Sequence, residues 1–468
     1  MTARSARGVP LVLEVAVPRA VLRTLAARCP ERFPVLLESV AAGALGRFSI
    51  LFGAPSGAIW REPSGRTYRD GHVQSTSSFL ATLEHAATAT AQTDSAVLAD
   101  GTCLPFCGGW FVVLGYEVAG EIESRLTLPS TNLPFDALAL RVSTALIFDH
   151  SSDRLYAVAE PGSEEAINVL IEQTQSHAAQ PATNRATTNR RYVGAIEEED
   201  PALFLDRVAR VQAYIAAGDV YQANLSRAWH AAQLPTATPT ALYEQLCATN
   251  PAPFAALLQW RDVAIVSSSP ERLLEIHGRE VSTRPIAGTR PRSQARHSDS
   301  LDLQELIAHP KERAEHVMLI DLERNDLGRI CEQGTVAVNE FMITESYAHV
   351  HHIVSNVRGT LRADVSPVAA LRAVFPGGTI TGCPKIRCME IIAELENAAR
   401  GFYTGSLGYL SNDGQCDFNI LIRTLTVQGG RIELRAGAGI VADSIPEREL
   451  EETRAKARGL LLALGAGE

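Results

Sequence analysis

Short apolar runs with the pattern of β-strands recur along this chain and alternate with charged segments of helical periodicity. Before residue 175 these runs are VPLVLEVAV, RFSILFGA, GGWFVVLGYEV and STALIFDH. Later runs are FAALLQW, DVAIVSSS, RLLEIHG and REVSTRPIAG, and the runs GSLGYLS and DFNILIRTLTVQ flank a typical hairpin turn, Asn-Asp-Gly at 412–414. Helices are predicted near 309–325, 366–374, 384–396 and 446–464. Because no strand–helix–strand repeat is visible, we expect an α+β fold.

One polar stretch, SHAAQPATNRATTNRR, lacks periodicity and separates the two halves of the chain. Its composition is typical of a linker. The boundaries predicted from it are an N-terminal region over 1–175, a linker over 176–191 and a C-terminal domain over 192–468.

The charge balance argues against two classes of partner. The 468 residues carry a formal net charge of −10, whereas nucleic acid and anionic membranes require a basic surface. No apolar run is long enough to span a bilayer. The eight cysteines are scattered and form no CxxC motif. We therefore expect a cytoplasmic protein with reduced thiols and neither nucleic acid nor membrane as a partner.

Two predicted helices each carry a pair of glutamates three residues apart, Glu312 with Glu315 and Glu449 with Glu452. Residues at this spacing share one face of a helix. If the helices meet, their carboxylates could hold a hard cation such as Mg²⁺, which prefers oxygen ligands and retains waters. The alternative is that both faces are simply solvated.

Other segments carry candidate anion-binding groups. The glycine-rich stretch GGTITGCPK runs into a helix, whose N-terminus attracts anions, although it is not a Walker loop and the turn could merely cap the helix. Gly437 and Gly439 end a strand and would allow close approach of a ligand, or form a bulge instead. Arg423 and Lys456 are candidate carboxylate clamps. Glu271 follows an apolar strand. If its side chain is buried, it could act as a general acid, whereas an exposed side chain would make it an ordinary turn residue.

Taken together and in order, these segments closely resemble the chorismate-utilising enzymes, which include anthranilate synthase component I, aminodeoxychorismate synthase component I, and the isochorismate and salicylate synthases. The resemblance is strong over 200–465 and weaker in PVLLES, RFSILFGAP and GGWFVVLGYE. It rests on the motifs GDVYQANLSR, SSPERLL, TRPIAGTRPR, KERAEHVMLIDLERNDLGRIC, HVHHIVS, FPGGTITGCPK, YTGSLGYLS, DFNILIRT, GAGIVADS and EETRAKA.

The resemblance implies an anthranilate synthase component I-like α+β fold, with two orthogonally packed antiparallel β-sheets, surrounding helices and a chorismate-binding catalytic domain over 192–468. It also implies a role for each candidate residue. Mg²⁺ would be held by Glu315 and Glu452, with its waters on Glu312 and Glu449. The enolpyruvyl carboxylate of chorismate would contact Tyr403 and Arg423. Glu271 would be the acid that assists departure of the C4 hydroxyl, and His352 would lie at the ring. The remaining substrate contacts would come from Thr379, Gly437, Gly439 and Lys456.

Position 222 narrows the choice among the chemistries of these enzymes. The isochorismate and salicylate branches resemble one another in carrying a lysine there that activates water, whereas this chain has Gln222. A neutral amide cannot activate water, and ammonia needs no such base. The two amine-adding branches therefore remain.

The signals between these two branches conflict. DFNILIRT, YTGSLGYLS and Thr381 resemble aminodeoxychorismate synthase. Many of those enzymes carry the motif PIKGT, whose lysine forms a covalent adduct with the ring. This chain has PIAGT instead, with Ala287 at the position of the lysine. PIAGT is the usual anthranilate synthase form. Alanine cannot be a nucleophile, so covalent catalysis through this position is excluded. More positions favour an aminodeoxychorismate synthase that uses ammonia directly, with anthranilate synthase as the alternative.

Two further expectations follow from the resemblance. Glu38 and Ser39 in PVLLES are similar to the tryptophan-binding element of the anthranilate enzymes and predict a pocket that binds tryptophan, whether structural or regulatory, although a plain strand edge is the alternative. The sequence carries no glutaminase signature. Ammonia is therefore expected from solution or from a separate glutamine amidotransferase subunit in a heterodimer.

Overall fold

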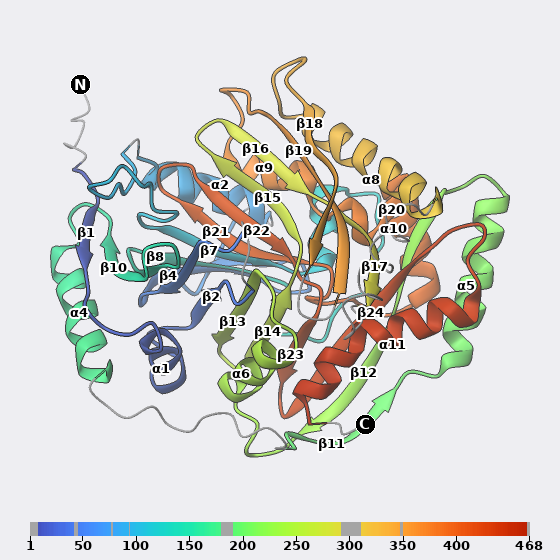
Figure 1. The fold of residues 1–468 in the computed structure, drawn as a ribbon, viewed down its shortest axis with the longest axis horizontal. Coiled ribbons are helices and arrows are strands. Elements are labelled where there is room, and N and C mark those ends of the chain that lie inside the picture. Colours follow the sequence, from blue (N-terminus) through green and yellow to red (C-terminus); the bar gives the residue numbers. More distant parts are fainter. Residues whose placement is uncertain are drawn as a thin grey trace.

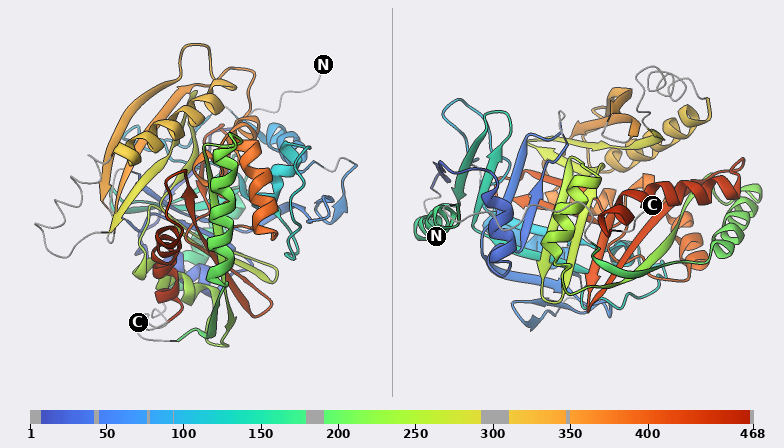
Figure 2. Two further views of the ribbon diagram at one scale, coloured as in Figure 1. Left: turned by 90° about the vertical axis from the view of Figure 1, so that its right-hand side faces the viewer. Right: turned by 60° about the horizontal axis from the view of Figure 1, so that its bottom comes forward.

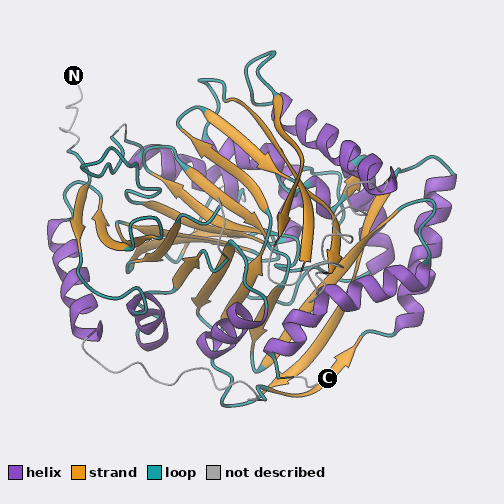
Figure 3. Cartoon of the chain, in the orientation of Figure 1, coloured by secondary structure: helices purple, strands orange, loops and turns teal. Residues whose placement is uncertain are grey.

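A computed structural model of the chain describes residues 8–41, 45–75, 78–92, 94–178, 191–291, 310–346 and 350–465. Within these ranges, the side chains of residues 287–291, 310–312, 346 and 350–352 lie outside the description. Two large antiparallel sheets form the centre of the molecule, and helices surround them (Figures 1 and 3). This arrangement confirms the predicted α+β fold of two antiparallel sheets with surrounding helices.

The first sheet combines strands from both ends of the chain. A short strand, β20 (Gly382–Cys383), pairs with β12 beside the main path. The strands run in the order β1 (Leu11–Glu14), β10 (Arg154–Ala159), β9 (Thr144–Asp149), β3 (Phe48–Phe52), β2 (Val35–Glu38), β13 (Phe254–Trp260), β14 (Val263–Ser269), β23 (Thr424–Gln428), β24 (Arg431–Ile440), β12 (Gln222–Gln233) and β11 (Val193–Glu198).

The second sheet is likewise built from both halves. Strand β18 (Ala337–Ser346) pairs with β19 beside the main path. The strands run in the order β17 (Ile286–Pro291), β19 (Val350–Thr360), β16 (Glu280–Arg284), β15 (Arg272–His277), β22 (Cys416–Ile420), β21 (Ser406–Ser411), β7 (Gly109–Leu114), β8 (Ala137–Val142), β4 (Pro55–Arg61), β5 (Thr67–Arg69) and β6 (His72–Val73).

Four of the helices begin at a polar residue that caps them. Ser78, Asp200, Thr238 and Ser366 cap these helices through side-chain hydrogen bonds to backbone N–H groups. The described helices are α1 (Val21–Arg28), α2 (Phe79–Thr90), α3 (Ala119–Ile122), α4 (Glu164–Ala178), α5 (Pro201–Ala216), α6 (Pro239–Thr249), α8 (Pro310–Gly328), α9 (Pro367–Val374), α10 (Lys385–Glu396) and α11 (Pro446–Ala463), with 3₁₀ turns η1 (Tyr116–Val118) and η2 (Gly378–Ile380).

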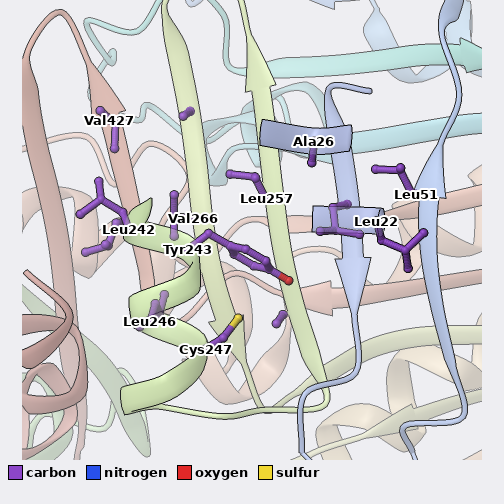
Figure 4. Close-up of a cluster of buried hydrophobic side chains, with 14 of the residues drawn as sticks. Leu22, Ala26, Leu51, Leu242, Tyr243, Leu246, Cys247, Leu257, Val266 and Val427 are labelled. Atoms are coloured by element: carbon purple, nitrogen blue, oxygen red, sulfur yellow. The ribbon is translucent and has the colours of Figure 1, made fainter. Parts of the chain in front are cut away.

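Apolar side chains fill three main layers around the sheets. One cluster lies between the two sheets and joins residues such as Ile50 and Ile265 of the first to Phe111 and Leu138 of the second. Another joins the outer face of the first sheet to α1, α4, α6 and α11, and part of it is drawn in Figure 4. A third joins the second sheet to α2, α8, α9 and α10. The helices therefore cover the outer faces, as Figure 2 also shows.

The two predicted halves of the chain share both sheets. Strand β2 pairs with β13 in the first sheet, and β7 pairs with β21 in the second. Of the predicted linker over 176–191, residues 179–190 lie outside the described residues, and α4 extends to Ala178.

Two predicted strands are interrupted. DFNILIRTLTVQ forms β22 in the second sheet and β23 in the first, because the backbone turns at Arg423, where φ is +51°. A non-glycine residue in the left-handed region cannot continue an extended strand. REVSTRPIAG divides into β16 and β17 at Pro285, which lacks the N–H that strand pairing needs. The predicted hairpin over 412–414 is confirmed, with β21 and β22 paired across it and Gly414 at φ +87°.

Candidate active site

A buried carboxyl group lies at the junction of the two sheets. Glu271 follows the end of β14 and is only 3% exposed. Its Oε1 accepts a hydrogen bond from the Ile286 N–H at 3.3 Å. Burial raises the pKa of Glu271 to about 7, and the nearby charge of Glu323 adds to this effect. The Thr379 hydroxyl, the Ile286 N–H and the Lys456 ammonium oppose the shift. Glu271 is therefore poised to carry a proton near neutral pH.

The glycine-rich segment forms a tight turn beside this carboxyl group. Thr379 lies within η2, and the Gly378 N–H donates to Oε1 of Glu323 at 3.3 Å. Thr381 is fully buried and its hydroxyl donates to the Gly377 carbonyl at 2.9 Å. The turn then continues into β20, which pairs with the start of β12 at Gln222. The Thr379 side chain is thereby fixed against Glu271 and β12.

Glycines on β24 allow side chains of neighbouring strands to approach its backbone. A Cβ atom on Gly437 would lie 2.6 Å from the Leu225 carbonyl oxygen and 2.9 Å from the Tyr403 hydroxyl. A Cβ atom on Gly439 would lie 2.3 Å from Nε2 of Gln222. Neither glycine is required by its φ angle. At Gly437 the added Cβ would meet a backbone carbonyl, whereas at Gly439 its nearest contact would be the end of the Gln222 side chain.

Two polar atoms in this region are buried and make no hydrogen bond within the described residues. They are Oε1 of Gln222 and Oδ1 of Asn224. Gln222 and Asn224 lie two residues apart on β12, so their side chains share one face of the strand. Buried polar groups without partners are costly. These two oxygen atoms are therefore suited to a ligand that supplies hydrogen-bond donors.

Cationic and phenolic groups complete the site. Nζ of Lys456 on α11 lies 3.0 Å from the Gly437 carbonyl oxygen and 2.7 Å from Oε1 of Glu452. Burial lowers the pKa of Lys456, but Glu452 outweighs it, so the pKa is raised and the lysine stays charged. The positive charge of Arg423 acts to lower the pKa of Lys456. Burial raises the pKa of Tyr403, whereas the positive charges of Arg400 and Lys456 act to lower it. The site is thus cationic where Tyr403 lies.

The predicted metal ligands lie on two helices that flank these elements. Helix α8, which carries Glu315, packs against η2 and β20, and α11, which carries Glu449 and Glu452, packs against β24. Glu449 is buried, whereas the Glu452 side chain is 48% exposed. Carboxylate oxygens are the ligands that Mg²⁺ prefers, so this donor set fits the ion chemically. Within the described ranges, no three His, Cys, Asp or Glu side chains are arranged to hold a metal.

Two of the predicted site residues have side chains outside the description. Glu312 lies in the first turn of α8, and His352 lies on β19 opposite Thr289 of β17 and Glu345 of β18. The structure therefore brings together Glu271, Thr379, Lys456, Tyr403 and Gln222 around β12, β24 and η2. It gives no side-chain geometry for Glu312 or His352.

A cavity of about 790 Å³ lies between the two sheets, and none of the candidate active-site residues lines it. Its lining includes Glu38, Phe48, Phe254, Arg272, Glu275 and Tyr409. Oε2 of Glu38 accepts hydrogen bonds from Nε of Arg23 at 2.7 Å and from the Tyr243 hydroxyl at 2.9 Å. Figure 4 shows the Tyr243 ring among the apolar side chains of α6, β13 and β14. The Ser39 N–H donates to the hydroxyl of Ser49 at 3.2 Å.

The sequence pattern did not identify several polar residues around the site. Glu323 and Asn224 are two of them, and Glu396 and Arg400 lie deeper in the protein. Charged residues on helices, such as those in DLERND and ELENAAR, look like solvated faces from sequence alone. Their burial depends on elements far away in the chain, so no local pattern marks it.

Comparison with known proteins places the chain in a family. The family model for chorismate binding enzymes matches residues 48–462. The chain is 40% identical to anthranilate synthase component 1 from Thermus thermophilus over 453 residues, 95% of this chain and 94% of that one. It is also 40% identical to aminodeoxychorismate synthase component 1 from Bacillus subtilis over 373 residues, 78% of each chain.

A solved structure gives the same result for the fold. Anthranilate synthase component I from Streptococcus pneumoniae superimposes with a TM-score of 0.78 at 32% identity, covering 90% of this chain and 93% of that one. The fold and the site thus define a chorismate-utilising enzyme. The chain belongs to the chorismate binding enzyme family.

Proposed function

We propose that this enzyme aminates chorismate with ammonia to form 4-amino-4-deoxychorismate, a step toward para-aminobenzoate and folate. The observation that carries the proposal is the buried Glu271 carboxyl, whose pKa is raised to about 7 beside the cationic region around Lys456. The C4 hydroxyl of chorismate leaves poorly unless it is protonated. A carboxyl group that retains its proton near neutral pH supplies that proton as the C–O bond breaks.

The polar groups on β12 favour ammonia as the nucleophile. Gln222 is neutral, so it cannot remove a proton from water, but its unpartnered Oε1 suits a ligand that donates hydrogen bonds. Ammonia is such a donor, and it attacks carbon through its own lone pair without a base. The neutral amide at this position therefore supports amine addition over hydroxyl addition.

The favoured product follows from sequence positions near the site. DFNILIRT, YTGSLGYLS and Thr381 resemble the aminodeoxychorismate branch, and Thr381 is held rigidly in the turn that carries Thr379. Because Ala287 offers no nucleophile, the amine would have to add directly to the ring carbon. The second candidate is an anthranilate synthase, which converts chorismate and ammonia to anthranilate and pyruvate. PIAGT is the observation that favours it.

We assign the anion-binding groups by charge. Arg423, Tyr403 and Lys456, with the backbone at Gly437 and Gly439, receive the enolpyruvyl carboxylate, and Thr379 contacts the substrate beside Glu271. His352 would lie at the ring. Mg²⁺ would be held by Glu315 and Glu452, with Glu312 and Glu449 on its waters, and when bound it neutralises the ring carboxylate of chorismate.

The proposal extends to partner and location. A separate glutamine amidotransferase subunit would supply ammonia in a heterodimer, in keeping with the component names of the relatives. The eight cysteines are free thiols, which supports a cytoplasmic location. No helix in the described part of the chain is both long and apolar enough to cross a membrane. Tryptophan is the proposed occupant of the cavity that Glu38 lines, with Ser39 next to it in the chain.

Consumption of chorismate tests the class of reaction. The purified chain is incubated with chorismate, Mg²⁺ and ammonium, and chorismate loss is followed with and without EDTA. We expect loss that requires both ammonium and Mg²⁺. Chorismate loss that proceeds equally well without ammonium would contradict the amination. If no amidotransferase from the same cell permits turnover with glutamine, the partner proposal fails.

A further inference from the structure

A buried ion network adjoins the cationic region of the active site. It consists of Glu396, Arg400, Arg435 and Ser226, here called the Arg400 network, and each side chain is at most 5% exposed. Glu396 ends α10, Arg400 follows it, and Ser226 and Arg435 lie on β12 and β24. None of these residues has a role in the proposed reaction so far.

All five N–H donors of Arg400 are used. Nε and Nη2 donate to the two carboxylate oxygens of Glu396 at 3.0 and 2.7 Å. The remaining donors reach the Ile380 carbonyl at 3.1 Å, the Thr404 hydroxyl at 3.3 Å and the Asn224 carbonyl at 2.7 Å. Only a planar guanidinium offers five donors in this fixed geometry. Arg400 therefore joins three separate segments at one point.

Glu396 holds the network together. Its Oε1 accepts hydrogen bonds from the N–H and hydroxyl of Ser226 at 2.7 and 2.9 Å. Its Oε2 also accepts one from Nη2 of Arg435 at 3.2 Å. Burial alone would raise the pKa of Glu396, but Arg400 and Arg435 outweigh it and the pKa is lowered. The network thus holds one carboxylate and two guanidinium groups, and Nη1 of Arg435 also lies 3.9 Å from Oε1 of the partly exposed Glu433.

Each segment that Arg400 joins carries a group of the active site. The Ile380 carbonyl belongs to the turn that carries Thr379. The Asn224 carbonyl belongs to β12, whose Asn224 side chain reaches the space beside Gly437. The Arg400 guanidinium also lies over the Tyr403 ring, 5.8 Å from its centroid. Arg435 lies two residues before Gly437, on the same face of β24.

We propose that Arg400 is a positioning residue that fixes Tyr403, the Thr379 turn and β12 in the geometry that receives the carboxylate of the substrate. This inference rests on the proposed function, since it assumes that an anionic group of chorismate lies at Tyr403. The inference predicts that KM for chorismate depends on the guanidinium group of Arg400, whereas KM for ammonium does not.

The test replaces Arg400 by lysine, which keeps the charge but has three donors on one nitrogen. The control is Arg227→Lys. Arg227 is fully buried, pairs with Glu198 at 2.7 Å, and lies next to Ser226 on the opposite face of β12. Steady-state kinetics with chorismate and with ammonium, and the melting temperature, are measured for both variants.

We expect Arg400→Lys to raise KM for chorismate about tenfold, as the loss of one or two charge-assisted hydrogen bonds predicts. KM for ammonium should stay unchanged. Arg227→Lys should lower the melting temperature while leaving both KM values unchanged. If Arg400→Lys and Arg227→Lys lower the melting temperature alike and leave KM for chorismate unchanged, Arg400 is only structural and the inference is overturned.

A second variant keeps the test decisive if Arg400→Lys does not fold. Arg435→Lys loosens Glu396 without removing any hydrogen bond to Ile380 or Asn224, and it should raise KM for chorismate in the same direction. An unchanged KM overturns the inference. Calorimetric titration with chorismate in the absence of ammonium separates the Arg400 inference from the proposed amination. Weaker binding by the variants supports the Arg400 role even if the parent shows no amination, whereas a parent that binds no chorismate overturns both.

Discussion

Lys456 and Glu452 form an ion pair across one turn of α11, with Nζ of the lysine 2.7 Å from Oε1 of the glutamate. The same ammonium donates to the Gly437 carbonyl at 3.0 Å. One helix thus links Glu452, a proposed ligand of Mg²⁺, to β24, the strand proposed to receive the substrate carboxylate. If both proposals hold, α11 fixes the position of one site relative to the other.

The first prediction concerns the metal. Glu452→Gln and Glu315→Gln each remove a charged oxygen ligand, so kcat/KM at fixed Mg²⁺ should fall about 100-fold or more, with the fold retained by circular dichroism. Glu451→Gln is the matched control, since Glu451 is an exposed neighbour on α11 that pairs with Arg454. Unchanged activity in both test variants would remove the metal assignment.

The second prediction concerns the acid. Glu271→Gln should lower kcat about 100-fold or more, because the amide has no proton to give to the leaving hydroxyl. In the parent, kcat/KM expressed per free ammonia should fall as the pH rises through about 7, where Glu271 loses its proton. A profile that shows no such fall, or a variant that remains active, would contradict this role.

The same residue links stability to pH. The pKa of Glu271 is raised from 4.5 to about 7 in the folded protein, so its contribution to stability is fully present below pH 4.5 and is lost as the pH rises through 7. In Glu271→Gln the side chain cannot ionise, so the stability of the variant does not fall in this way as the pH rises. Its free energy of unfolding relative to the parent should therefore increase by about 3 kcal/mol between about pH 4.5 and 8. Urea unfolding at both pH values measures this difference, and a difference independent of pH would refute the burial argument.

The third prediction separates the two glycines of β24. An added Cβ at Gly437 meets the backbone carbonyl of Leu225 at 2.6 Å, so Gly437→Ala should destabilise the pairing of β12 with β24. At Gly439 it meets only the end of the Gln222 side chain, which can move. Gly439→Ala should therefore keep its melting temperature and lose about tenfold in kcat/KM, because Gln222 is displaced. Equal loss of stability in both variants would count against this account.

The fourth prediction concerns the cavity between the sheets. L-tryptophan should raise the melting temperature of the parent, since a ligand that binds only the folded state stabilises it. Glu38→Gln should lose this response and about 1–3 kcal/mol of stability, because the partner of Arg23 and Tyr243 is neutralised. Tryptophan that leaves the melting temperature of the parent unchanged would exclude it as the occupant.

Much of the fold could be predicted because strand and hairpin signals are local. Gly414 marks the turn between β21 and β22, and the apolar strand before Glu271 predicted where that residue emerges. The change of sheet at Arg423 could not be predicted, since arginine has no preference for the positive φ found there. Glu396 and Arg400 could not be assigned a role from the sequence, because only tertiary packing buries them.

Product analysis tests the central claim most directly. The purified chain is incubated with chorismate, Mg²⁺ and ammonium at alkaline pH, with and without a lyase that releases 4-aminobenzoate from 4-amino-4-deoxychorismate. The proposed amination predicts 4-aminobenzoate only when the lyase is present. Fluorescent anthranilate formed without the lyase would contradict it and make the chain an anthranilate synthase.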